Sequence, residues 1–79
     1  MTTITLTDEH KTAAYIMGGH RARAERTLEV PGPNLELDES DIADIAYTVT
    51  GYKLDVESDE AQTLALEYSE GYDDVWGWD

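Results

Sequence analysis

Apolar residues follow two different periods along this chain, and each period predicts a different kind of element. Over residues 2–7, Ile4 and Leu6 alternate with threonines, which is the two-residue period of a half-buried strand. The same alternation predicts a short strand at residues 52–56 and a short extended piece at residues 35–37. We therefore expect extended segments at these three places.

A helical period of 3.6 residues begins after Thr7, a residue type that caps helix N-termini, and continues over residues 8–26. The acids at the start of this segment suit the positive end of a helix dipole. Gly18 and Gly19 interrupt the segment, and each glycine costs a helix about 1 kcal/mol relative to Ala. The sequence therefore predicts a first helix, and a hairpin that turns at the two glycines is the competing interpretation.

Two further helices are predicted after the Pro-Gly-Pro-Asn turn at residues 31–34. One is capped by Asp38 or Ser40, runs to about Thr50, and ends where Gly51 adopts the left-handed conformation. Its apolar stripe consists of Ile42, Ile45, Ala46 and Val49.

The last predicted helix covers residues 59–69, with Ser58 as its cap and Gly71 as its end. Its apolar face consists of Ala61, Leu64, Ala65 and Tyr68. All these elements predict one small domain over residues 1–79. We expect the α+β class, with two or three helices and short strands, and a mostly α domain is the alternative.

The charge of this small domain is unusually negative and unevenly distributed along the chain. The chain has 18 acids and five bases, and its net charge is −13. Residues 28–79 contain 15 of the acids and only Lys53 as a base, whereas residues 1–27 contain three acids and four bases. Because 41% of the residues are hydrophobic, we expect a folded chain that carries this charge on its surface.

The residues do not favour catalysis. His10 and His20, the only histidines, are too far apart on one helix to share a metal or a proton, and there is no cysteine. Neither a Gly-x-Ser-x-Gly elbow nor a phosphate-binding glycine motif is present. The acids from Asp55 onward lack the glycine and glutamate that a calcium loop requires at its sixth and twelfth positions. We expect a cytoplasmic protein that is not an enzyme, has no cofactor or metal, and does not bind a membrane.

The acids of the predicted helices form the candidate binding surface. Asp41 and Asp44 lie one turn apart, as do Glu67 and Glu70, and like charges at that spacing destabilise a helix. DNA also presents a row of single negative charges, so rigidly held carboxylates can take the place of phosphates. The candidate partner-binding residues are Asp38, Asp41, Asp44, Asp59, Glu60, Glu67, Glu70, Asp73, Asp74 and Trp76.

Trp76 is included because exposed tryptophans often anchor interfaces, although completion of a small core is the favoured interpretation for Trp76 and Trp78. We expect Arg21, Arg23 and Arg26 to pair with the protein's own acids or with those of a second copy, so a homodimer stays open. Direct binding of nucleic acid is not expected, because the acidic remainder of the chain repels phosphate. The partner we expect is a basic nucleic-acid-binding protein.

In these features the sequence resembles the small phage-encoded anti-CRISPR proteins. It is short, lacks cysteine, opens Met-Thr-Thr-Ile, holds dense acids over residues 36–44 and 55–70, and closes in the acidic aromatic segment 72–79. This is a likeness of style and not of motif, and the basic residues 21–26 depart from it. The resemblance implies an inhibitor that mimics DNA charge and blocks target DNA binding by a type I CRISPR effector complex in the host cytoplasm.

Two other functions remain compatible with the same residues. One is an antitoxin-like or accessory subunit that binds a basic protein partner. The other is a small domain of unrelated role from a salt-adapted proteome, in which a low lysine content and many acids are typical. The concentration of the acids in residues 28–79 argues mildly against general salt adaptation, which would acidify the whole surface.

Overall fold

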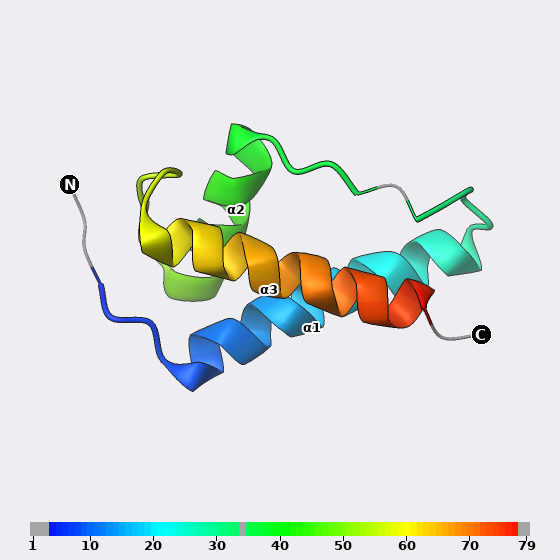
Figure 1. The fold of residues 1–79 in the computed structure, drawn as a ribbon, viewed down its shortest axis with the longest axis horizontal. Coiled ribbons are helices and arrows are strands. Elements are labelled where there is room, and N and C mark those ends of the chain that lie inside the picture. The colour runs from blue at the N-terminus through cyan, green and yellow to red at the C-terminus, as the bar shows by residue number, and fades with distance from the viewer. Residues whose placement is uncertain (1–3, 34, 78–79) are drawn as a thin grey trace.

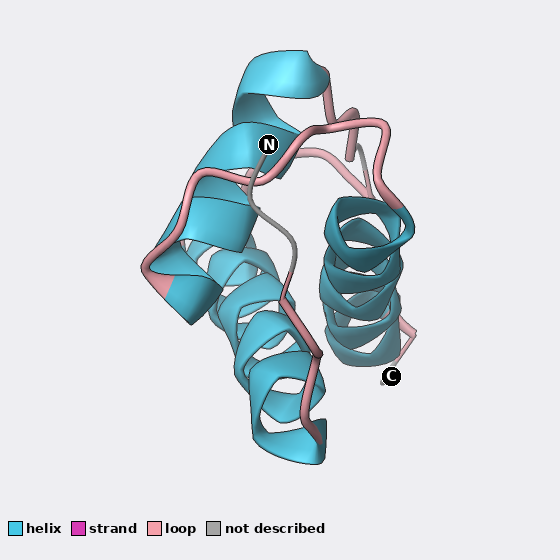
Figure 2. Cartoon of the chain, turned by 90° about the vertical axis from the view of Figure 1, so that its left-hand side faces the viewer, coloured by secondary structure: helices cyan, strands magenta, loops and turns pink. Residues whose placement is uncertain are grey.

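The computed structural model describes residues 4–33 and 35–77, which form three helices. These are α1 (Asp8–Thr27), α2 (Glu39–Thr50) and α3 (Asp59–Trp76). The long helices α1 and α3 lie side by side and run in the same direction, while α2 crosses them near the start of α3 (Figures 1 and 2). No helix in the described part of the chain is long and apolar enough to cross a membrane.

The predicted α+β class is wrong, because residues 4–33 and 35–77 contain helices and no strand. The alternation that suggested strands does describe burial: Ile4, Leu6, Leu35 and Leu37 are half-buried, whereas Thr5 and Glu36 between them are exposed. Around Leu54 burial alternates in the same way. The segments at residues 4–7 and 35–37 turn alternate side chains onto the helices without forming a strand, whereas the predicted strand at residues 52–56 begins in a bend and runs into a turn at residues 56–57. Among the described residues no neighbouring segment completes a ladder of backbone hydrogen bonds.

The helix starts are those that the sequence predicts. Thr7 Oγ1 accepts the His10 N–H at 3.3 Å, and His10 Nδ1 accepts the Thr7 N–H at 3.2 Å, which makes a reciprocal capping box. Ser58 caps α3 by accepting the Ala61 N–H at 3.2 Å. Gly51 ends α2 with φ of 77°, the left-handed conformation expected there.

Gly18, Gly19 and Gly71 all lie inside helices. The hairpin at Gly18 and Gly19 is wrong, because α1 is continuous through both residues, and the predicted end of the last helix at Gly71 is wrong, because α3 continues to Trp76. A Cβ at Gly18 would stand 1.9 Å from the Tyr68 carbonyl oxygen, and one at Gly71 would stand 1.9 Å from that of Tyr15. These glycines let the α1 and α3 backbones touch, a role that depends on the facing helix.

The core is small and consists mainly of short side chains. The buried cluster comprises Ala14, Ile45, Ala46, Leu54, Ala61, Leu64 and Tyr68. Tyr72 and Leu64 are the largest side chains with no exposed surface. Because alanine and glycine fill the contact between α1 and α3, the stability of the fold depends on close packing of two backbones more than on bulky apolar groups.

Candidate functional site

The exposed side of α3 collects six of the ten candidate residues. The helix packs inward through Ala61, Leu64, Tyr68, Gly71 and Tyr72. At 3.6 residues per turn, the positions opposite this stripe turn to solvent. We call the acids on this side the α3 acidic face: Asp59, Glu70, Asp73 and Asp74, which are exposed, and Glu60 and Glu67, which are half-buried at its edge.

The order of these acids along α3 follows from helix geometry. Glu60, Glu67 and Asp74 are seven residues apart, so they lie almost in line along the helix axis with a rise of about 10.5 Å between neighbours. Glu70 and Asp73 lie to one side of this line. The backbone of α3 holds all of them on one element, so the surface is ordered without further folding.

No acid of the α3 acidic face forms an ion pair with a described base, although Arg23 and Arg26 line a hollow together with Asp74. The ion pair that forms within residues 4–33 and 35–77 joins Arg21 to Glu25, neither of which belongs to this face. Lys11 lines a shallow hollow together with Asp59 and Glu60, and it is the nearest base at that end. Asp74 accepts a hydrogen bond from the Tyr15 hydroxyl. Most of the face is therefore available to a positively charged partner.

Leu66 is a residue of this surface that the sequence analysis missed. It lies on the exposed side of α3, between the acids, with 59% of its surface accessible. An apolar side chain surrounded by polar ones is the arrangement found at protein interfaces. Its place off the apolar stripe of Ala61, Leu64 and Ala65 is the signal by which it could have been found.

The acids of α2 do not extend the α3 acidic face. Asp38 Oδ1 accepts the Asp41 N–H at 2.8 Å, and Asp41 accepts the Asp38 N–H at 3.3 Å, so both carboxylates cap α2. Asp41 and Asp44 border a hollow of about 160 Å³ that is also lined by Arg21 and Tyr68. Because Tyr68 belongs to the buried side of α3, this hollow and the acidic face lie on different sides of that helix.

Trp76 contributes to the fold. It is the last residue of α3, and its ring lies against Gly32, where an added Cβ would stand 2.8 Å from the indole. The ring centroids of Trp76 and Tyr72 are 6.3 Å apart, and Nε1 is buried without a hydrogen-bond partner among the described residues. These contacts hold the 28–38 connection on the helices and favour the core interpretation over an exposed anchor. Trp78 lies outside the described residues.

Of the three arginines, Arg21 pairs with an acid as expected. Its Nε is 3.2 Å from Glu25 Oε2, and Glu25 also accepts a hydrogen bond from the Tyr72 hydroxyl. The Tyr72 contact, followed by the Arg21 contact, lowers the pKa of the Glu25 carboxyl, although desolvation opposes this. Arg26 donates to the Val75 carbonyl at 2.8 Å, near the negative end of the α3 dipole.

Comparison with protein-family models, with curated proteins and with solved structures gives no match for this chain. Within the described residues, no group of three or more histidine, aspartate or glutamate side chains could hold a metal ion. The chemistry of the surface is therefore the basis on which a function can be inferred.

Proposed function

We propose that this protein is a non-enzymatic inhibitor that binds a basic nucleic-acid-binding protein through the α3 acidic face. The observation that carries the proposal is the set of six carboxylates on the exposed side of one helix, none of them in an ion pair with a described residue. Lysines and arginines that otherwise contact phosphates meet a comparable row of negative charges. Because α3 already holds these charges, binding requires little ordering.

The preferred target is a type I CRISPR effector complex, a choice that comes from the resemblance to small anti-CRISPR proteins. Such a complex holds target DNA on positively charged surfaces, and an acidic protein that occupies them blocks DNA binding. The inhibitor would act in the cytoplasm of the host cell of a phage. Competition through charge also implies that inhibition weakens as salt rises.

The exposed apolar side chains favour a second candidate, an accessory or antitoxin-like subunit. Tyr47 and Tyr52 are 53% and 55% exposed, and Leu66 lies within the acidic face. A subunit that is permanently bound to a basic protein would cover such groups. This candidate predicts poor folding of the isolated chain and recovery when the partner is present.

A DNA-competition assay tests the first proposal. A purified type I effector complex is offered labelled target DNA, with and without this protein, at low and at physiological salt. The test variant carries Glu67→Lys, Glu70→Lys and Asp73→Lys. The control variant carries Glu36→Lys, Asp44→Lys and Glu57→Lys, which are exposed acids outside α3, so both variants change the net charge equally.

We expect the wild-type protein to prevent DNA binding, and the α3 variant to lose at least about tenfold in potency, or 1.4 kcal/mol of binding free energy. The control variant should stay within about threefold of the wild type. Circular dichroism establishes that both variants fold. Equal losses in the two variants would contradict a role for this particular face, and DNA binding that is unaffected at every salt concentration would exclude this target.

A further inference from the structure

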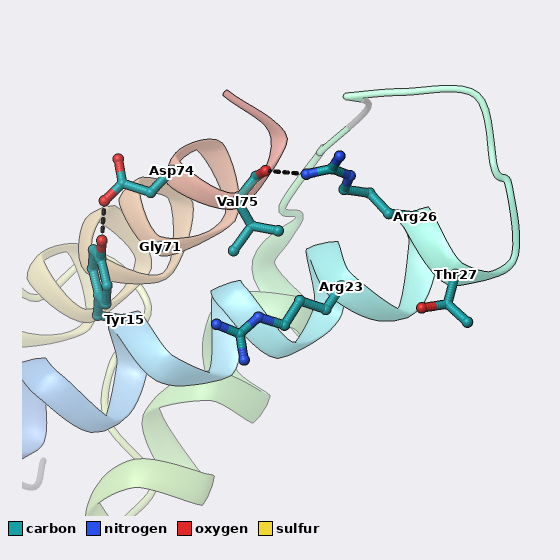
Figure 3. A pocket seen from close by; sticks show the side chains of 7 residues that line it. All are labelled: Tyr15, Arg23, Arg26, Thr27, Gly71, Asp74 and Val75. Carbon is teal, nitrogen blue, oxygen red and sulfur yellow. Dashed lines mark hydrogen bonds between the residues drawn. The ribbon is translucent and has the colours of Figure 1, made fainter. Parts of the chain in front are cut away.

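A groove runs between the C-terminal halves of α1 and α3, beside the α3 acidic face (Figure 3). Its volume is about 540 Å³, and its walls include Tyr15, Arg23, Thr27 and Val75. This size lies within the range of pockets that hold small organic groups, and most of the lining is apolar. Gly71 forms part of the wall, at the point where the α1 and α3 backbones come into contact.

Hydrogen bonds fix both ends of the groove. The Tyr15 hydroxyl donates to the Asp74 carboxylate, which ties α1 to α3 at one end. At the other end Arg26 donates to the Val75 carbonyl oxygen at 2.8 Å (Figure 3). These contacts hold the walls in place before any ligand arrives, so little conformational entropy is lost when the groove is filled.

Arg23 differs from the other two arginines in this region. Arg21 pairs with Glu25 and Arg26 donates to α3, whereas Arg23 makes no hydrogen bond or ion pair with a described residue. The positions one turn away on α1 are Gly19, His20, Arg26 and Thr27, none of which is an acid. Its side chain extends along α1 in the direction of Tyr15 (Figure 3). None of the described acids forms an ion pair with this guanidinium, although Asp74 lines the same groove.

We propose that the groove binds a carboxylate that adjoins an aromatic or branched aliphatic side chain, presented by a peptide segment of the partner protein. The carboxylate would pair with the guanidinium fork of Arg23, and the apolar group would rest on Tyr15, Gly71 and Val75. That the occupant belongs to a partner protein rests on the proposed function, since the same partner would lie across the adjoining acidic face.

The surrounding charge favours a single carboxylate over nucleic acid. Asp74 lines the groove, and Glu70 and Asp73 lie on the same helix, so a row of phosphates would meet repulsion along its length. A lone carboxylate needs only the one arginine. The positive Arg23 and the negative α3 acidic face lie side by side on the inhibitor, and together they fix the orientation of the partner. If the partner were shifted along this surface, groups of like charge would face each other.

Nuclear magnetic resonance on the full ¹⁵N-labelled chain tests the groove without the partner. The probe is N-acetylphenylalanine, which joins a free carboxylate to an aromatic ring. N-acetylphenylalaninamide, which lacks the charge, and inorganic phosphate, which lacks the apolar group, are the comparison ligands. The variants are Arg23→Gln and, as a matched loss of one exposed base outside the groove, Lys53→Gln.

We expect the acid to shift the Arg23 Nε–Hε signal and the amides of Gly71 and Val75 saturably, with a dissociation constant on the order of 1 mM. The amide should bind at least about tenfold more weakly, Arg23→Gln should abolish saturation, and Lys53→Gln should not change it. Phosphate should produce no saturable shift.

Equal binding of acid and amide, retained binding in Arg23→Gln, or phosphate binding as strong as that of the acid would each overturn the inference. The variant with three lysines on α3 keeps Arg23 and Tyr15, so it should still bind the probe. A failed probe experiment therefore leaves the DNA-competition result intact, and a failed competition experiment leaves the groove intact.

Discussion

At the scale of single residues, Glu25 is one of the polar groups that join the long helices. Its side chain is 19% exposed, and it joins Arg21 on α1 to the hydroxyl of the fully buried Tyr72 on α3. Both contacts favour the ionised carboxylate, which is why the pKa of Glu25 is lowered. Because the pKa of the Glu25 carboxyl is lower in the folded protein, the free energy of unfolding depends on pH.

The stability contribution of Glu25 should disappear in acid. Because its folded pKa lies below the unfolded value of about 4.3, the contribution is complete above that value and is lost as the pH falls through the folded pKa. Glu25→Gln should therefore lower the free energy of unfolding by about 1 kcal/mol at pH 7, and by progressively less below pH of about 4. Urea denaturation at a series of pH values measures the difference.

The control for this experiment is Glu36→Gln, which removes one exposed acid without touching Arg21 or Tyr72. It should cost less than about 0.5 kcal/mol at each pH. If the loss in Glu25→Gln is the same at pH 7 and at pH 3, the hydrogen bonds to the ionised carboxylate do not contribute as the structure implies.

At the scale of elements, the contact between α1 and α3 is made by backbones that approach through glycine. Gly18 faces the Tyr68 carbonyl and Gly71 faces that of Tyr15, so the two helices touch at two points along their length. Each glycine weakens its own helix by about 1 kcal/mol relative to Ala. The closer packing offsets this local cost. This gain in packing exists only when α1 and α3 are in contact.

Alanine substitutions separate the local cost from the packing gain. A Cβ at Gly18 would stand 1.9 Å from a carbonyl oxygen, so Gly18→Ala should lower the free energy of unfolding by about 1–3 kcal/mol despite better helix propensity. At the neighbouring Gly19 the nearest atom is Val75 Cγ2 at 3.5 Å, an ordinary contact. Gly19→Ala should be neutral or more stable by up to about 1 kcal/mol.

Urea denaturation of both variants gives the comparison, and Gly71→Ala should behave like Gly18→Ala. The two glycines at 18 and 19 share a sequence context, so propensity alone predicts the same effect for both. If Gly18→Ala is as stable as Gly19→Ala, the close backbone approach of α1 and α3 is not present in solution.

At the scale of the whole molecule, charge and size act together. The molecule measures 40 × 23 × 16 Å and carries a net charge of −13. The Debye length is about 30 Å at 0.01 M salt and about 8 Å at 0.15 M. At low salt the acids of α2, α3 and the connections therefore repel one another across most of the molecule, while at physiological salt mainly neighbours interact.

Salt should stabilise the fold by screening this repulsion. We expect the melting temperature to rise by at least about 4–8 °C between 0.01 M and 0.5 M NaCl, which is about 1 kcal/mol for a domain of this size. Thermal unfolding followed by circular dichroism measures it. The variant with Glu67→Lys, Glu70→Lys and Asp73→Lys should show a smaller rise, because it carries less net charge.

The same experiment distinguishes the inhibitor from a domain of a salt-adapted proteome. An inhibitor that works at cytoplasmic salt should be folded at 0.01 M NaCl, although less stable. A chain that is unfolded there and folds only near molar salt would favour salt adaptation. A melting temperature that does not change with salt would contradict the repulsion argument for this protein.

The sequence by itself determined where the helices begin, where α2 ends, and which side chains of the three predicted helices point inward. Thr7, Ser58 and Gly51 could be assigned, and Asp38 was one of two candidate caps, because cap hydrogen bonds and left-handed turns involve residues within four positions of one another. The alternation at residues 4–7 correctly separated inward from outward side chains. Asp59, Glu60 and Glu67 lay within the predicted last helix, whereas Asp73 and Asp74 fell beyond its predicted end and joined the same helix only in the structure.

Only the tertiary structure decided what each inward or polar residue meets. Whether an extended segment becomes a strand depends on a neighbouring chain, and whether Gly71 ends a helix depends on the backbone of Tyr15. Residues far away in the sequence also decide three other features: the separation of the α2 acids from the α3 acidic face, the burial of Trp76 Nε1, and the place of Arg23 in the groove between α1 and α3. Local patterns encode local hydrogen bonds and periodicity, whereas contacts between helices appear only when the chain has brought them together.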